Sequence, residues 1–171
     1  MQKLVWNRRR LLLHEVGIMK IPYYKQETNY TCGLASARMV LEALGIKRSE
    51  KQLARLLKTN TRVGTHFKYF TQLAERYHLD YIVGRNATID DLEKALDERY
   101  LVIAGHYLPL PVEPDEHYSV ILSIDRDYVY THDPWCGPNQ KRSRAFFRKW
   151  WEKHISKYEK EKGFFIGMKK S

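Results

Sequence analysis

The chain has 171 residues, of which 43% are hydrophobic and 13% aromatic, so it suits one packed domain and is not a disordered chain. Lys and Arg number 30 against 20 Asp and Glu, which gives a net charge of +10. A surface of this sign favours anionic partners, whether nucleic acid, acidic polypeptides or membrane headgroups.

The apolar runs and the cysteine content argue against a membrane-spanning, secreted or disulfide-rich protein. No apolar run approaches the roughly 20 residues that a membrane span requires, and Leu11–Leu13 is too short for a signal peptide. The two cysteines, Cys32 and Cys136, cannot build a disulfide framework. We therefore predict a single domain over residues 1–171, cytoplasmic and without a membrane span, in which residues 1–20 form an arm or an edge segment.

Helical patterns fill the first hundred residues. Apolar residues at helical spacing, together with start and stop signals, predict helices at residues 32–44, 48–59, 66–79 and 88–98. Gly45 is the expected C-cap of the first helix. Ser49 and Gln52 form a capping-box pattern at the start of the second, and Thr88 is the expected N-cap of the fourth.

Later segments are typical of an antiparallel sheet. Short runs rich in β-branched and aromatic residues predict strands at residues 100–108, 117–125, 127–133 and 163–170. Asp125 to Asp127 is the expected tight turn of a hairpin, and residues 142–154 form a predicted last helix before the final strand. Helices first and antiparallel strands later indicate an α+β fold.

Cys32 stands where the first predicted helix begins. Free backbone N–H groups and the helix dipole favour a thiolate at that position, and the thiolate is the nucleophilic form of cysteine. Gly33 lets the chain turn into the helix and would leave room for a substrate backbone. The competing interpretation is a small, buried and inert side chain at a helix start.

A thiolate nucleophile needs a partner that can later protonate a leaving group, and histidine is the usual choice. His117 opens a predicted strand, so the sheet would hold its ring. Asp133 ends the next strand and, counted across the turn, should lie opposite His117, while Pro134 fixes the strand's exit. His117 could also be only a hydrogen-bonded strand-end histidine, and Asp133 only a turn residue.

Taken in order, these motifs resemble the papain-like cysteine peptidases, and most of all the bacteriocin-processing (double-glycine leader) peptidases and their stand-alone relatives. The motifs are Q-x5-C-G from Gln26, H-Y-x-V from His117 and D-P-W from Asp133. The resemblance covers the chain from about residue 21, including the helix start at Gly64 and the aromatic segment at residues 145–151. It implies a papain-like α+β fold, with an N-terminal helical part packed on a C-terminal antiparallel sheet.

The same resemblance implies roles for four residues. Cys32 would be the nucleophile, His117 the general acid and base, and Asp133 the group that orients His117. Gln26 would donate, together with the Cys32 backbone N–H, to the developing oxyanion. The implied activity is peptidase or amidase acyl transfer on a peptide or protein substrate, acidic ones being favoured by the basic surface, with neither metal nor organic cofactor.

Three departures from that branch leave the substrate open. Thr31 precedes the cysteine where the branch often has Asp, and basic arms extend at both ends. No transporter follows, so a coupled leader peptidase and exporter is not expected. Two other classes of function compete: a catalytically silent papain-like binding module, and a basic nucleic-acid-binding protein, although no nucleic-acid motif is recognised. The sequence does not indicate an oligomeric state.

Cys136 raises two further hypotheses. It could form a disulfide with Cys32 and so gate the nucleophile. A zinc cluster is also conceivable, although neither Cys-x-x-Cys nor His-Glu-x-x-His spacing supports it; its members would be Cys32, His117, His132, Asp133 and Cys136.

Overall fold

The computed structural model of the protein describes residues 20–108, 115–157 and 159–171. The arm predicted at residues 1–20 therefore lies almost wholly outside the described residues. The elements, in chain order, are α1 (Cys32–Ala43), α2 (Glu50–Leu56), α3 (Lys68–Arg76), β1 (Leu79–Gly84), α4 (Ile89–Asp97), β2 (Leu101–Leu108), β3 (Asp115–Ile124), β4 (Tyr128–Asp133), β5 (Gly137–Ser143), α5 (Arg144–Phe147), the π-helical turn η1 (Arg148–Glu152) and β6 (Phe164–Lys170).

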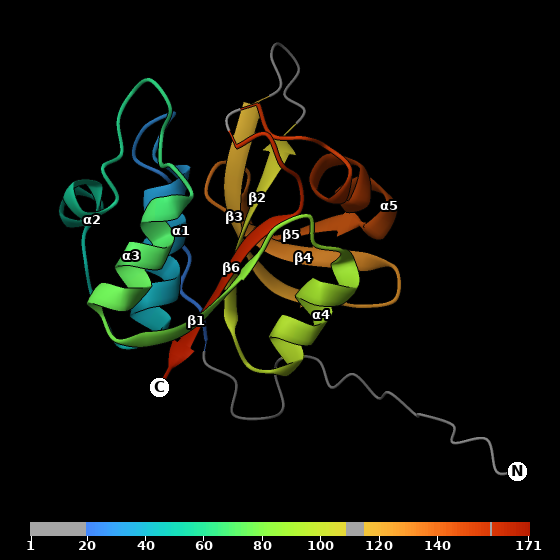
Figure 1. Cartoon of the computed structure of the whole chain (residues 1–171), viewed down its shortest axis with the longest axis horizontal. Helices are drawn as coiled ribbons and strands as arrows, with labels where there is room; N and C mark the ends of the chain where they lie inside the picture. Colours follow the sequence, from blue (N-terminus) through green and yellow to red (C-terminus); the bar gives the residue numbers. More distant parts are fainter. Residues whose placement is uncertain (1–19, 109–114, 158) are drawn as a thin grey trace, which may run out of the picture.

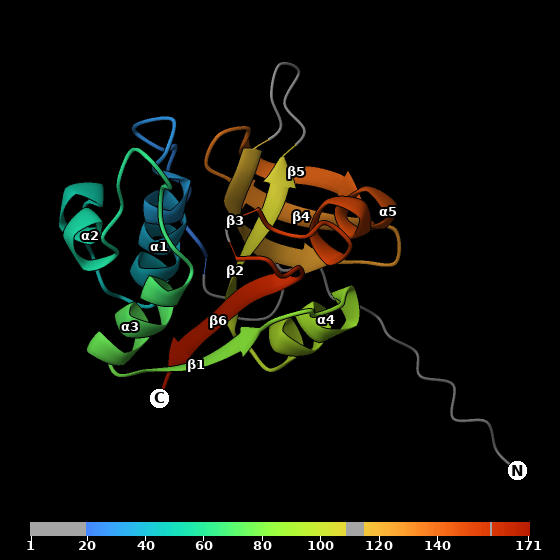
Figure 2. The same ribbon diagram turned by 45° about the horizontal axis from the view of Figure 1, so that its top comes forward.

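Six antiparallel strands form one sheet in the order β1-β6-β2-β3-β4-β5. Helices α1 and α3 pack on one side of it, with α2 against α1, whereas α4, α5 and η1 lie on the other side (Figure 1, Figure 2). The predicted packing of an N-terminal helical part on an antiparallel sheet is thus confirmed.

Each face of the sheet contributes to its own hydrophobic core. Successive strand residues point to opposite faces, and in β2 Ile103 packs in the core shared with α1 and α3. Its neighbours Val102 and Ala104 pack in the second core, which also holds Phe147 and Trp151. Because the sheet is covered on both sides, the central strands are rigid supports for the residues at their ends.

The predicted helix signals are confirmed by their hydrogen bonds. At α2, Gln52 N donates to Ser49 Oγ at 3.2 Å while Ser49 N donates to Gln52 Oε1 at 3.0 Å. Thr88 is the N-cap of α4, as predicted. The C-cap of α1 is Leu44 rather than Gly45, which follows it with a φ of +84°, a conformation that favours glycine.

Four elements were predicted wrongly or missed. α3 ends at Arg76 rather than at residue 79, because His78 adopts a φ of +52° and turns the chain into strand β1, which the sequence pattern did not reveal. β5 was also missed, since this strand is polar throughout. The last helix is only four residues long and continues as η1 to Glu152.

The predicted alignment of His117 with Asp133 was also wrong in register. His117 is the third residue of β3 rather than its first, and Val120 pairs with His132. Antiparallel pairing is symmetric about a hairpin turn, so Asp133, six residues after the turn, cannot lie opposite His117, which is eight residues before it. A bulge between Ile121 and Ser123 shifts the register by one residue. The two side chains therefore meet diagonally.

Candidate active site

Cys32 is the first residue of α1 and is 9% exposed. Its N-cap residue, Thr31, makes no side-chain hydrogen bond to the helix, and the first turn carries no acidic residue. The first N–H groups of α1 are therefore not neutralised by a capping side chain. This arrangement suits a negatively charged sulfur or oxygen at the helix start.

The sequence suggested that Gly33 leaves room for a substrate backbone, but the structure shows that it does not. Thr65 fills the space beside it: a Cβ added at Gly33 would lie 2.6 Å from Thr65 Oγ1. The glycine is needed there for packing, because any side chain would overlap Thr65.

His117 lies between the nucleophile candidate and a carboxylate. Its Nε2 is 2.8 Å from Asp133 Oδ1, and its ring lines the same cavity as the Cys32 side chain. Since Nε2 is engaged by Asp133, Nδ1 is the ring nitrogen available to the sulfur. The structure thus brings Cys32, His117 and Asp133 together in the predicted order.

The charges of this group favour a protonated His117. Burial alone would lower the pKa of the imidazole, but the Cys32 thiolate charge and the hydrogen bonds to Asp133 and Cys32 raise it to about 10. An imidazolium beside a thiolate is the form in which a Cys–His pair attacks a carbonyl.

Asp133 is fully buried and is held in place by several partners. Its Oδ1 accepts the backbone N–H groups of Trp135 and Cys136, both at 2.9 Å, besides His117. The Arg142 guanidinium approaches Oδ2 at 3.5 Å. Burial would raise the pKa of this carboxyl, but the hydrogen bond and charge of His117, with the Cys136 N–H, hold it well below its usual range. Asp133 is therefore an ionised carboxylate.

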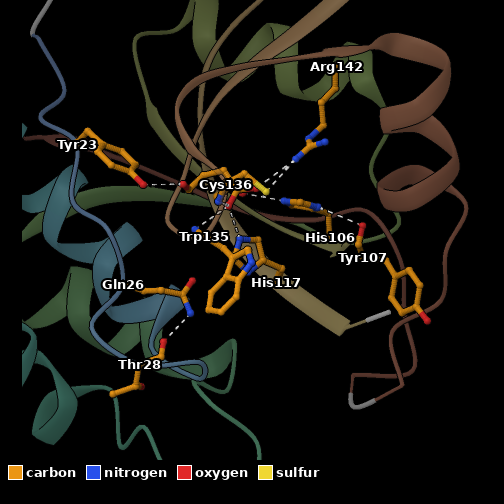
Figure 3. Close-up of polar contacts among 11 residues, drawn as sticks. Tyr23, Gln26, Thr28, His106, Tyr107, His117, Trp135, Cys136 and Arg142 are labelled. Carbon is orange, nitrogen blue, oxygen red and sulfur yellow. Dashed lines mark hydrogen bonds and ion pairs between the residues drawn. The ribbon is translucent and has the colours of Figure 1, made fainter. Parts of the chain in front are cut away.

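Gln26 enters the same site from the loop before α1. Its backbone N–H donates to Pro134 O at 3.1 Å, and its Nε2 donates to Thr28 O at 2.7 Å (Figure 3). An amide nitrogen carries two hydrogens, so one N–H fixes the side chain and the second is left for another acceptor. The Gln26 side chain points toward the area of His117 and Trp135 in this view.

A cavity of about 900 Å³ joins these groups. Gln26, Cys32 and His117 line it together, with Trp135, which is 48% exposed, at its rim. Aromatic side chains continue the wall farther away, where the rings of Tyr107 and Trp150 stack at 5.3 Å. The cavity is large enough for several residues of a peptide.

Sequence reasoning missed His106, which is buried next to His117 and lines the same cavity. The signal was a repeated His-Tyr pair, His106-Tyr107 and His117-Tyr118, in two strands that pair in the sheet. Arg142 and Thr65 were missed as well, because only the folded chain brings them to the site.

No observation in the described part of the chain supports a disulfide between Cys32 and Cys136 or a zinc cluster that includes them. Both cysteines are free thiols, and Cys136 is exposed and lies 3.5 Å from the Arg142 guanidinium. Among residues 20–108, 115–157 and 159–171, no group of three or more His, Cys, Asp or Glu side chains could hold a metal ion. Over the same ranges, no helix is long and apolar enough to span a bilayer.

Comparison with known proteins shows which family has this sequence pattern and which solved structures have this fold. A sequence model described as the Peptidase C39-like family matches residues 18–159, whereas no curated protein matches the chain significantly. A protein described as a C39-like peptidase of Bacillus anthracis is 16% identical over 90% of this chain and 96% of its own, with a TM-score of 0.68.

Two further solved structures are similar. The peptidase domain of Streptococcus ComA, a bifunctional ABC transporter of a quorum-sensing pathway, is 20% identical over 89% of this chain and all of its own, with a TM-score of 0.69. A double-glycine motif protease from an AMS/PCAT transporter, solved with a leader peptide, is 19% identical over 90% of this chain and 94% of its own, with a TM-score of 0.68. These structures confirm the predicted papain-like α+β fold.

Proposed function

The chain belongs to the Peptidase C39-like family, and from this membership we propose that it is a cysteine peptidase whose nucleophile is Cys32. The proposal rests above all on one observation: His117 lines one cavity with Cys32 and lies 2.8 Å from the buried carboxylate of Asp133. That geometry is the arrangement of a nucleophile, its base and an orienting group.

In the proposed first half-reaction, the Cys32 thiolate attacks the carbonyl carbon of a peptide or amide bond. The carbonyl oxygen becomes an oxyanion, which accepts hydrogen bonds from the Cys32 backbone N–H and the second N–H of Gln26. When the C–N bond breaks, the imidazolium of His117 gives its proton to the leaving amine. A thioester on Cys32 and a free amine result.

In the second half-reaction, His117, now neutral, removes a proton from water, which attacks the thioester carbonyl. The C–S bond breaks, the carboxylic acid leaves, and the thiolate–imidazolium pair is restored. Asp133 remains ionised throughout and stabilises the charge on His117. An amine in place of water would give acyl transfer with the same groups.

The proposed substrate is a peptide or an unfolded segment of a protein. One similar protease was solved with a leader peptide, and the cavity beside Cys32 has the volume for an extended chain. The net charge of +10 would attract acidic peptides. The single-domain organisation and the cytoplasmic location stay predictions from the sequence.

The test is cleavage of a set of synthetic peptides, including double-glycine leader sequences and acidic sequences, followed by mass spectrometry. Cys32→Ser is expected to abolish cleavage, and Cys136→Ser to leave it within about twofold of the wild type. Cleavage by Cys32→Ser at the wild-type rate would refute the proposal.

A further inference from the structure

His106 on β2 pairs directly with His117 on β3. The two imidazole rings lie 5.6 Å apart, centroid to centroid, with perpendicular planes, so the edge of one meets the face of the other. Each residue is only 7% exposed. His106 is thus the immediate neighbour of the candidate general acid, although no step of the proposed reaction uses it.

Hydrogen bonds hold the His106 ring at both nitrogens. Nδ1 lies 3.4 Å from the carbonyl of Tyr107, and Nε2 lies 2.8 Å from the hydroxyl of Ser119, which is fully buried. A carbonyl can only accept, so Nδ1 carries a proton, whereas a serine hydroxyl can donate to an unprotonated Nε2. A neutral ring is therefore fully hydrogen-bonded in this position.

A second ring also packs near His106. The Phe147 ring of α5 lies 5.9 Å from it, with an angle of 44° between the ring planes. His106 thus has an apolar ring and the His117 ring as neighbours. A ring packed against two others and bonded at both nitrogens is clamped, with little freedom to rotate.

The surrounding charges agree with a neutral His106. Burial first, and then the charge of His117, lower its pKa to about 3, with a smaller contribution from Arg142. Asp133 and the Tyr107 carbonyl act in the opposite direction but do not prevail. His106 thus adds no positive charge beside the imidazolium of His117.

We propose that His106 is a positioning residue for His117: its neutral, clamped ring holds the His117 ring in the orientation that faces Cys32 and Asp133 at once. The proposal rests on the proposed function, because it concerns the same Cys–His pair. His106 transfers no proton in it. Its contribution is the shape of its ring and its lack of charge.

The test compares His106→Ala, which removes the ring, with His106→Phe, which keeps an uncharged ring. The readout is the rate of iodoacetamide alkylation at Cys32 at pH 6, followed by mass spectrometry, together with NMR titration of His117. His106→Ala is expected to slow alkylation by about 10- to 100-fold, since misplacement by about 1 Å has effects of this size. His106→Phe is expected to stay within about threefold of the wild type.

A matched control removes buried volume elsewhere. Val129→Ala creates a cavity in the second core, away from the His106 and His117 rings. In this variant Cys32 should be alkylated at the wild-type rate. The positioning proposal would be overturned by wild-type alkylation in folded His106→Ala, by equal slowing in His106→Phe, or by equal slowing in Val129→Ala.

The same experiment separates this proposal from the proposed function. If His117→Ala alkylates as fast as the wild type, there is no Cys–His pair and both proposals fail. If His117→Ala is slow but His106→Ala is not, only the role of His106 is refuted. A raised His117 pKa that is lost in His106→Ala and kept in His106→Phe would support positioning.

Discussion

Thr65 lies against Gly33 so closely that position 33 cannot carry a side chain. A Cβ at Gly33 would come within 2.6 Å of Thr65 Oγ1 and 2.7 Å of Thr65 Cβ. Thr65 cannot move aside easily, because its hydroxyl pairs with that of Thr59 at 2.7 Å and its carbonyl accepts the Tyr118 hydroxyl at 3.1 Å. This contact fixes the start of α1, and hence Cys32, relative to β3.

Gly33→Ala should therefore destabilise the protein by about 1–3 kcal/mol, the usual cost of overpacking a close contact. Urea unfolding measures the loss. A double-mutant cycle with Thr65→Gly isolates the contact, because the cost of Gly33→Ala should shrink when Thr65 is absent. An equal cost in both backgrounds would show that the contact is not responsible.

The Cys32–His117 pair predicts an unusual pH profile of alkylation. A thiol without a partner, with an ordinary pKa of about 8.5, is thiolate in only about 1 molecule in 300 at pH 6. The charge of His117, whose pKa is raised, should keep Cys32 reactive at pH 6, so His117→Ala should alkylate about 10- to 100-fold more slowly there. The difference should narrow toward pH 9. Parallel profiles for the two proteins would contradict the pair.

Asp133→Asn tests the charge of the orienting group separately from its hydrogen bonds. An Asn at 133 can still accept the N–H groups of Trp135 and Cys136, but it brings no negative charge to His117. The pKa of His117 should fall, and kcat for peptide cleavage should drop by about 10- to 100-fold. Asp133→Ala removes the acceptors too, so it should lower both activity and stability. A wild-type kcat in Asp133→Asn would exclude an electrostatic role.

The lowered pKa of His106 predicts that the protein loses stability as the pH falls. Its pKa is lowered on folding, so the unfolded chain binds a proton at this residue between about pH 6.5 and the folded value of about 3, where the folded protein does not. Stability from this group is complete above pH 6.5 and is lost as the pH falls. In urea titrations from pH 7 to pH 4, the wild type should lose stability more steeply than His106→Phe, by up to about 1.4 kcal/mol per pH unit. Equal slopes would rule out a buried neutral His106.

Sequence patterns predicted the fold where local signals were strong. The capping box at Ser49 and the glycine after α1 both appear in the structure. Strand β1 was missed because it is an edge strand whose central residues are mostly solvent-facing, so apolar residues do not alternate along it. β5 is polar for the same reason. Edge strands are specified by their partners more than by their own residues.

Only those residues of the candidate site that belong to motifs in a recognisable order along the chain could be predicted from the sequence. Cys32, His117 and Asp133 were predicted because their order and element types matched a known pattern. Their diagonal meeting depends on the hairpin register and its bulge, which no count along the sequence yields. Thr65 and His106 reach the site through packing between distant segments, and only the repeated His-Tyr pair hinted at the second histidine.

The two cysteines provide a last prediction that needs no substrate. Cys136 is exposed, yet burial of its sulfur and the nearby Asp133 charge raise the pKa of its thiol. Cys32 is buried but lies beside the imidazolium of His117. At pH 6 a limiting amount of iodoacetamide should therefore label Cys32 before Cys136, the reverse of the order that exposure alone dictates, and His117→Ala should restore labelling in order of exposure. Peptide mapping by mass spectrometry reads both sites in one sample. Preferential labelling of Cys136 in the wild type would mean that Cys32 is a buried structural thiol.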